Sequence, residues 1–341
     1  MAKRLKYTVL ILLFTFICGE LFVRIYDLYA GINGYSHNNL EFIYIPNSYY
    51  NYSFRPGAVA RIDRKDHKEI RINSLGYRGD DFGPVKPEGT FRIICFGGSS
   101  TFGVYEKDNS STWPALLERR LRGAGSKKKI EVINAAGPGY TTFESLSRYI
   151  NEAVNFSPDL IIVYHTINDA YLSGKIRADK PVEKVRNFHR LHNPLNRFLL
   201  HSRLYSLVYS LAQQRYLSRC RETVPKDADL SFSRRAFKRN LSLFVSASQE
   251  GNVRLILATQ LIDGAKCPPW LVPVVEDYTA IIREVSAKYR LTLVDTQTLI
   301  SGEGMNTLLN DEVHFNSTGN EWLSDIFAQK IKDEGFLEEQ L

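Results

Sequence analysis

The chain has 341 residues, of which 44% are hydrophobic and 24% charged, and it carries a formal net charge of +7. These proportions are those of a globular protein and exclude a collagen-like chain, a disordered chain or a polytopic membrane protein. The excess of 44 basic over 37 acidic residues comes without a zinc-finger spacing or an RNA-binding aromatic motif, so nucleic acid is not an expected partner.

Residues 1–25 predict a membrane anchor. Basic residues precede the apolar stretch YTVLILLFTFICGELFV (7–23), in which Glu20 is the one charged residue. The stretch reaches the short end of a membrane-spanning helix, and no small-residue cleavage site follows it. The basic flank predicts a single-pass protein with a cytoplasmic N-terminus and an extracytoplasmic or periplasmic remainder. The competing interpretation is a buried N-terminal helix of a soluble protein.

Residues 26–90 predict an N-terminal extension of loops and a few strands. The segment is rich in Tyr, Asn, Gly and Pro and holds short alternating pieces such as HKEIRIN, which are typical of strands and turns rather than of helices. From residue 91 to 341 the pattern changes to β-rich apolar runs that alternate with helical periodicity. This alternation predicts βα units around a parallel sheet that is buried on both faces.

Five apolar runs are the candidate strands of this α/β domain. They are RIICFG (92–97), IEVINA (130–135), DLIIVYH (159–165), VRLILAT (253–259) and LTLVD (291–295). Helical spacing of apolar residues marks the connections: a helix from Trp113 with Pro114 in its first turn, one that Thr141 and Glu144 begin with a capping box, one around Phe237, and STGNEWLSDIFAQKI near the C-terminus.

A basic segment at about 170–235 interrupts the alternation and predicts an insertion after the third strand. It contains the amphipathic stretch NPLNRFLLHSRLYSLVYSLAQQR, whose apolar face favours packing against the protein, with a membrane or lid surface as the alternative. His189 and His192 share a helical face there but have no acidic or cysteine ligands beside them, so no metal site is expected.

The four cysteines form no C-x-x-C pair, and none is a candidate for catalysis or for metal binding. Cys95 lies inside a strand and is expected to be a small core residue. Cys220 and Cys267 are the one pair for which a disulfide is plausible in an exported domain.

Ligands of an open parallel sheet bind beyond the carboxyl ends of its strands, and polar residues follow four of the predicted strands there. The first strand ends at Gly97-Gly98 and is followed by Ser99. Glycines allow a serine hydroxyl and its N–H to face a substrate together. The alternative is a tight turn in which a serine caps a helix. A phosphate-binding loop is disfavoured because its Lys-Ser/Thr pair is missing, and Ser100 and Thr101 exclude a G-x-S-x-G elbow.

The later segments supply the other groups that acyl transfer requires. NAAGPGYTT (134–142) exposes backbone at its glycines, and Asn168 offers an amide donor to a developing oxyanion. Asp311 and His314 stand three residues apart before the last helix, a spacing that lets a carboxylate orient an imidazole. Taken singly, these segments are more often a plain turn, a helix cap and a surface histidine; taken together they predict one site.

On these residues the stretch from about 91 to 335 resembles the GDSL, or SGNH, family of serine hydrolases. GGSSTFG matches the family's G-D-S-x-T-x-G, which makes Ser99 the implied nucleophile rather than Ser100. NAAGPGYTT and TIND resemble the second and third blocks and imply an oxyanion hole formed by Ser99, Gly139 and Asn168. DEVH matches D-x-x-H, so Asp311 and His314 complete the implied triad.

The resemblance implies a three-layer α/β/α, flavodoxin-like fold with a five-stranded parallel sheet, and it implies no metal and no organic cofactor. Gly98 replaces the aspartate of the first block and Thr166 the glycine of the third, departures that concern the shape of the pocket. INSLGYRG (72–79) resembles a segment of membrane-tethered bacterial members, and we expect its Arg78 to reach the rim of the site.

The expected protein is therefore an exported, membrane-anchored serine esterase that cleaves O-acyl groups of envelope glycans or lipids through an acyl-enzyme. The sequence leaves three alternatives open. One is an O-acyltransferase with the same triad, one is a catalytically silent envelope-binding protein, and one is a lipase whose 195–215 segment lies on a membrane.

Overall fold

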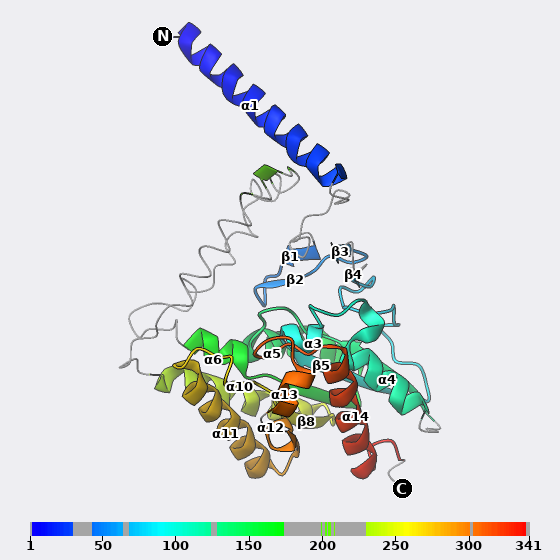
Figure 1. The fold of residues 1–341 in the computed structure, drawn as a ribbon. Helices are drawn as coiled ribbons and strands as arrows, with labels where there is room; N and C mark the ends of the chain where they lie inside the picture. The colour runs from blue at the N-terminus through cyan, green and yellow to red at the C-terminus, as the bar shows by residue number, and fades with distance from the viewer. Residues whose placement is uncertain are drawn as a thin grey trace.

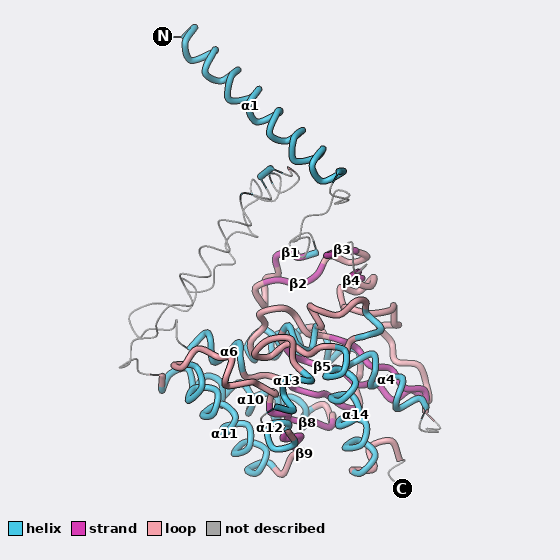
Figure 2. Tube along the Cα trace, viewed as in Figure 1, coloured by secondary structure: helices cyan, strands magenta, loops and turns pink. Residues whose placement is uncertain are grey.

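Five parallel strands form the central sheet, and helices cover both of its faces (Figures 1 and 2). The computed structural model describes residues 2–29, 43–63, 68–123, 128–173, 199, 202, 204, 205, 208, 230–300 and 303–338. The strands are β5 (Thr90–Gly97), β6 (Lys129–Asn134), β7 (Leu160–Tyr164), β8 (Arg254–Thr259) and β9 (Thr292–Asp295). Their spatial order is β6-β5-β7-β8-β9, which is the flavodoxin-like order. The predicted fold and its five strands are confirmed.

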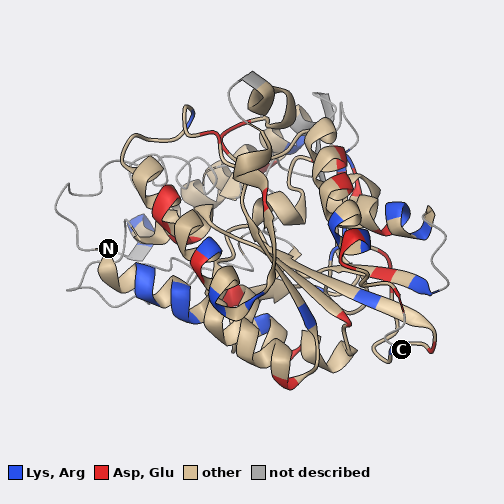
Figure 3. Ribbon diagram, turned by 90° about the horizontal axis from the view of Figure 1, so that it is seen from below, with Lys and Arg blue, Asp and Glu red and all other residues tan. Residues whose placement is uncertain are grey.

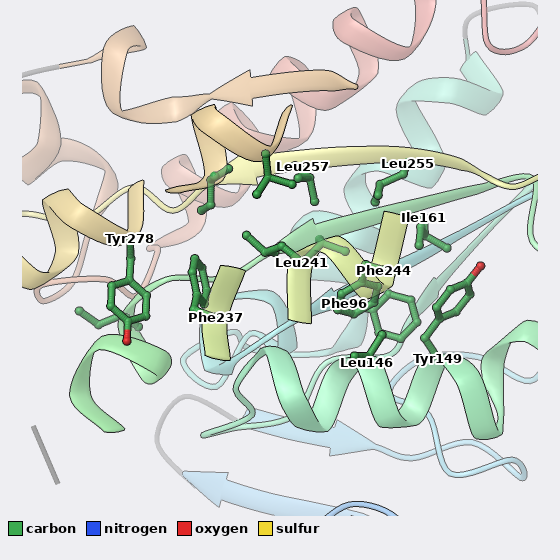
Figure 4. Close-up of a cluster of buried hydrophobic side chains, with 14 of the residues drawn as sticks. Phe96, Leu146, Tyr149, Ile161, Phe237, Leu241, Phe244, Leu255, Leu257 and Tyr278 are labelled. Carbon is green, nitrogen blue, oxygen red and sulfur yellow. The ribbon is translucent and has the colours of Figure 1, made fainter. Parts of the chain in front are cut away.

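Successive residues of the strands point to opposite faces of the sheet and thereby build two cores. One core joins Phe96, Ile161 and Leu257 to helices on the first face (Figure 4). The other joins Cys95, which is fully buried as predicted, to helices on the second face. The first face carries α5 (Thr142–Asn151), α6 (Ile167–Ser173), α10 (Ser231–Glu250) and α11 (Leu271–Tyr289), and the second carries α4 (Trp113–Gly123) and α14 (Ser317–Asp333).

Charged residues lie mainly on the surrounding helices and at the strand ends, while the middle of the sheet is almost free of them (Figure 3). Short helical segments complete the connections of the domain. They are α3 (Ser99–Phe102), η1 (Asn109–Ser111), η2 (Ala153–Phe156), α12 (Thr296–Leu299) and α13 (Glu303–Leu308). The capping box predicted from Thr141 and Glu144 begins α5. Helix α11 has no counterpart among the predicted helices.

The β6 edge of the sheet is covered by side chains of its own domain. Glu118 of α4 accepts the N–H of Val132 at 2.7 Å, and Arg122 donates to the carbonyl of Ile130 at 3.1 Å. An unpaired edge strand exposes backbone N–H and C=O groups with which a strand of a second chain can pair. The two α4 side chains occupy backbone groups that such a chain would use.

The N-terminal extension is built from two small antiparallel sheets, as its composition predicted. They pair β1 (Tyr44–Pro46) with β2 (Tyr52–Phe54) and β3 (Val59–Asp63) with β4 (Lys68–Arg71). Apolar residues of the extension share a core with Phe102 and Tyr140 of the main domain. The buried Arg148 of α5 donates to the carbonyl of Gly76 at 2.7 Å and lies 3.8 Å from the centre of the Tyr77 ring. The extension therefore packs as an integral part of the domain.

Helix α1 (Ala2–Tyr29) is long and apolar enough to cross a membrane from Lys3 to Tyr26, with a mean hydropathy of 2.1. None of its most apolar window is buried, so the alternative of a buried N-terminal helix is wrong. Signal sequences and membrane anchors share these properties. The carboxylate of Glu20 in this helix accepts from Arg24 at 2.8 Å and from the backbone N–H of Leu204 at 2.9 Å.

Most of the predicted insertion, together with His189, His192 and Cys220, lies outside the described residues. Of the proposed disulfide pair, Cys267 is described as a free and buried thiol. Burial raises the pKa of this thiol to about 11.

Candidate active site

The nucleophile candidate lies on a short turn between β5 and the four-residue helix α3. Strand β5 ends at Gly97, and Ser99 is the first residue of α3. Ser99 is partly exposed, whereas Ser100 and Thr101 are buried. The local structure therefore presents one hydroxyl of the three at the carboxyl edge of the sheet.

The structure brings Ser99, His314 and Asp311 together in a continuous chain of contacts. Ser99 Oγ lies 2.6 Å from His314 Nε2, and His314 Nδ1 lies 2.7 Å from Asp311 Oδ2. The His314 and Asp311 side chains are partly buried, with exposed fractions of 19% and 28%. The two ring nitrogens thus face a hydroxyl on one side and a carboxylate on the other, which is the arrangement that the resemblance implies for a Ser-His-Asp triad.

The loop that carries Asp311 holds the carboxylate ionised. The backbone N–H groups of Val313 and His314 both donate to Asp311 Oδ1, at 3.0 and 2.8 Å. Partial burial raises the pKa of Asp311, but the hydrogen bonds from the His314 ring and these N–H groups outweigh it and hold the pKa well below its ordinary value. Asp311 is therefore a carboxylate throughout the neutral pH range.

Two further contacts fix the imidazole relative to the nucleophile turn. The Tyr105 ring packs edge-on against His314 with 5.0 Å between ring centres. Ser100 Oγ donates to the carbonyl of Val313 at 2.9 Å and so ties α3 to the loop of His314. Apart from the nearness of both residues to Ser99, no sequence signal indicates these roles.

The oxyanion-hole candidates border the same turn. Gly139 is exposed and adopts a φ of 82°, a left-handed conformation that glycine favours. Its loop is joined to the turn because the N–H of Gly137 donates to the carbonyl of Gly97 at 3.2 Å. Asn168 Nδ2 donates to the carbonyl of Tyr140 at 2.9 Å, which holds the amide beside this loop.

A buried polar network supports the block that carries Asn168. The neighbouring Asp169 accepts from the backbone N–H of Thr142 at 3.0 Å and from its hydroxyl at 2.7 Å, which joins α6 to the start of α5. His165 is buried with its Nε2 at 2.8 Å from Ser145 Oγ, and burial lowers its pKa to about 3. Thr166, the departure in the third block, is buried and donates to the carbonyl of His165. These groups are neutral or paired parts of the scaffold.

The absence of a side chain at Gly98 leaves room for Asn168. A Cβ atom at Gly98 would lie 2.4 Å from Asn168 Nδ2 and 3.5 Å from the carbonyl oxygen of Tyr140. The first distance is far below van der Waals contact, so the amide would have to move. The departure at Gly98 therefore shapes the part of the site where the oxyanion-hole candidate Asn168 lies.

For the ester hydrolysis that the sequence predicts, we expect Gly98→Ala to lower kcat by about tenfold to a hundredfold, because displacement of a positioned group by about 1 Å has effects of this size. The measurement is ester hydrolysis at saturating substrate, with folding checked by circular dichroism. Gly123→Ala is the control, because an added Cβ at Gly123 meets no atom within 4 Å. Unchanged kcat in Gly98→Ala would contradict this role of Gly98.

Arg78 does not reach the rim of the site, so that expectation is wrong. Arg78 is 3% exposed, and its guanidinium lies at the end of α3, 4.9 Å from the centre of the Phe102 ring. Arginines usually keep their charge in water, and nothing in the sequence around Arg78 indicates that α3 offers enough acceptors to bury it.

Within the part of the chain that the structure describes, no group of three or more His, Cys, Asp or Glu side chains is arranged to hold a metal ion.

Residues 95–322 match the GDSL-like lipase/acylhydrolase family. A lipase/acylhydrolase from Enterococcus faecalis is 20% identical, with a TM-score of 0.48 over 72% of this chain and 96% of that one. The acetyl xylan esterase AlAXEase is 14% identical, with a TM-score of 0.48 over 71% and 100%. The psychrotrophic esterase EstA from a Pseudoalteromonas species is 16% identical, with a TM-score of 0.45 over 71% and 97%. A search of curated proteins found no match.

Proposed function

Because this chain belongs to the GDSL-like lipase/acylhydrolase family, we propose that it is a serine esterase with Ser99 as nucleophile, His314 as general acid–base and Asp311 as the orienting carboxylate. The observation that carries the proposal is the continuous contact from Ser99 Oγ through the His314 ring to Asp311, at 2.6 and 2.7 Å. This arrangement supplies the nucleophile, the base and the tautomer control that acyl transfer needs.

In the first half of the proposed reaction, Ser99 Oγ attacks the ester carbonyl while His314 Nε2 takes its proton. Asp311 accepts a hydrogen bond from the Nδ1–H of the ring and stabilises the imidazolium that forms. The carbonyl oxygen becomes an oxyanion, which the N–H groups of Ser99 and Gly139 and the amide of Asn168 stabilise. His314 then returns the proton to the alcohol oxygen as the ester bond breaks, which leaves the acyl group on Ser99.

In the second half, water attacks the acyl-enzyme with His314 as the base. The same donors hold the second oxyanion, and the proton on His314 goes back to Ser99 Oγ as the carboxylic acid leaves. Each step moves one proton between oxygen and Nε2, so the cycle needs no metal and no redox partner.

We expect Asn168→Ala to lower kcat by about a hundredfold to a thousandfold with a small change in KM, since removal of one oxyanion donor has effects of this size. Initial rates with a short-chain aryl ester measure it. Asn151→Ala is the matched control: its amide also donates to a backbone carbonyl, that of Ser147 at 2.8 Å, but on α5. Equal rates for the two variants would remove Asn168 from the oxyanion hole.

The experiment that tests the proposed function is labelling of the purified protein with a fluorophosphonate probe, followed by peptide mass spectrometry. The probe reacts with serines that a neighbouring base activates, so we expect a single adduct on Ser99 and hydrolysis of aryl acetates. A protein that neither reacts nor hydrolyses esters would favour a catalytically silent binding role. Transfer of the acyl group to an added glycan in preference to water would favour an O-acyltransferase.

We further propose that α1 tethers the domain to the outer surface of a membrane, with O-acyl groups of envelope glycans or lipids as substrates. Support comes from the apolar length of α1 and from the basic residues before its apolar stretch, which orient such helices with the N-terminus in the cytoplasm. Protease accessibility of the domain in intact cells, compared with lysed cells, tests this orientation.

A further inference from the structure

We infer that Arg78 of the N-terminal extension is a positioning residue for the proposed nucleophile, which it holds in place by hydrogen bonds to the carbonyls at the end of the short helix α3. The inference rests on the proposed function, because it concerns the reactivity of Ser99. It assigns to the segment INSLGYRG a role in catalysis that its sequence alone does not reveal.

The first step of the argument is the shortage of hydrogen-bond donors at the end of α3. The last carbonyls of any helix have no partner within it, and α3 has four residues. Phe102 is fully buried, so water does not reach this end of the helix. The carbonyl of Phe102 needs a donor from elsewhere in the chain, and that of Gly103, which already accepts the N–H of Glu106 at 3.0 Å, has one lone pair left for such a donor.

Arg78 supplies those donors. Its Nη1 donates to the carbonyls of Phe102 at 2.6 Å and Gly103 at 2.7 Å. Its Nη2 donates to the carbonyl of Asp108 at 3.1 Å, and its Nε to Asn109 Oδ1 at 3.0 Å. One planar guanidinium thus joins the end of α3 to the loop that follows it. A lysine carries all its N–H donors on one nitrogen, so it lacks the planar set of donors on three nitrogens that this arrangement uses.

Both sides of the Ser99–His314 contact depend on the segment that Arg78 holds. Ser99 begins α3, and the N–H of Gly103 donates back to the carbonyl of Ser99 at 2.8 Å. Two residues later, the Tyr105 ring packs on the His314 ring. A shift of the α3 end would therefore change the position of the nucleophile and of the ring beside its base.

The extension also holds the oxyanion side of the site. The Tyr52 hydroxyl donates to the carbonyl of Pro138, next to Gly139. The Tyr140 hydroxyl donates to the carbonyl of Tyr52 at 2.5 Å. The extension therefore binds the nucleophile turn and the oxyanion loop at once, so its contacts with α3 belong to the scaffold of the site.

The test compares Arg78→Lys with Arg92→Lys in the full-length protein. Arg92 is also a buried arginine that donates to backbone carbonyls, those of Gly83, Pro84 and Phe156, but it lies near the other end of β5. Thermal unfolding, kcat and KM for a short-chain aryl ester, and the rate of fluorophosphonate labelling are measured for each variant. Active-site titration with the probe normalises kcat to reactive enzyme.

We expect both variants to lower the thermal midpoint. Arg78→Lys alone should lower kcat and the labelling rate by about tenfold to a hundredfold, with KM within about twofold. Equal kcat per active site in the two variants would reduce Arg78 to a purely structural role and overturn the inference. A wild-type protein that does not label would instead refute the proposed function, so the two failures are distinct.

A second variant covers the case in which Arg78→Lys does not fold. Asn109→Ala removes one acceptor of Arg78 and keeps the guanidinium; it also removes the two hydrogen bonds of the Asn109 side chain with the backbone of Arg71, at 3.2 and 2.8 Å. Because Asn109 is partly exposed in η1, we expect the variant to fold. It should label about two- to fivefold more slowly than wild type, since three donors of Arg78 keep their carbonyl acceptors and the nucleophile is displaced only slightly. An unchanged labelling rate in Asn109→Ala would count against the inference.

Discussion

Replacement of Ser99 by alanine should lower kcat for ester hydrolysis by about 10⁵- to 10⁶-fold and abolish labelling by a fluorophosphonate probe. Losses of this size follow when the nucleophile of a catalytic triad is removed and binding and the oxyanion hole remain. Ser99 is partly exposed and its Oγ contacts His314, so loss of the hydroxyl should leave the fold intact. Rates at saturating substrate and thermal unfolding of both proteins measure the two effects.

The neighbouring serine provides the comparison for this prediction. Ser100 is buried, and its Oγ donates to the carbonyl of Val313. Ser100→Ala should therefore reduce the free energy of unfolding by about 1 kcal/mol and still yield a labelled protein. If labelling vanished in Ser100→Ala and persisted in Ser99→Ala, the assignment of the nucleophile would be reversed.

The central sheet could be predicted because its strands are buried on both faces. All eight residues of β5 and all five of β7 are buried. β7 therefore appears in the sequence as an unbroken apolar run, and β5 as an apolar run in which Arg92 is the one charged residue. Helix α11 was not predicted, although Val274, Tyr278, Ile282 and Val285 repeat at helical spacing and are buried. Its start has no side-chain cap and lies just after two consecutive prolines, so the usual signal for a helix N-terminus is missing.

The candidate site could be predicted to the extent that its groups follow strand ends. Parallel strands bring their carboxyl ends to one edge, so Ser99 and Asn168 are close although they are far apart in the sequence. The support behind them could not be predicted. Arg78 and Ser100 are buried by contacts with backbone carbonyls of other segments, and no local pattern in the sequence records which carbonyls lack a partner.

The second large effect is expected at Asp311. Asp311→Asn should lower kcat by about 10⁴-fold, because an amide does not stabilise the imidazolium and favours the wrong tautomer of the ring. Hydrogen bonds from His314 and from backbone N–H groups depress the pKa of Asp311. A depressed carboxyl pKa contributes stability above the pKa of the unfolded chain, and this contribution is lost as the pH falls through the folded value. The difference in stability between wild type and variant should therefore shrink in acid.

Asp295→Asn separates catalysis from stability in this experiment. Asp295 also has a depressed pKa, and it pairs with Arg283 at 2.7 Å at the end of β9. Both variants should lose stability at neutral pH and lose less of it in acid, whereas the fall in kcat should be confined to Asp311→Asn. Thermal midpoints from pH 8 down to about pH 2, well below the ordinary pKa of a carboxyl group, together with kcat at neutral pH, measure both effects. If Asp311→Asn kept wild-type kcat, His314 would hold its tautomer without this carboxylate. Asp311 would then not belong to the proposed triad.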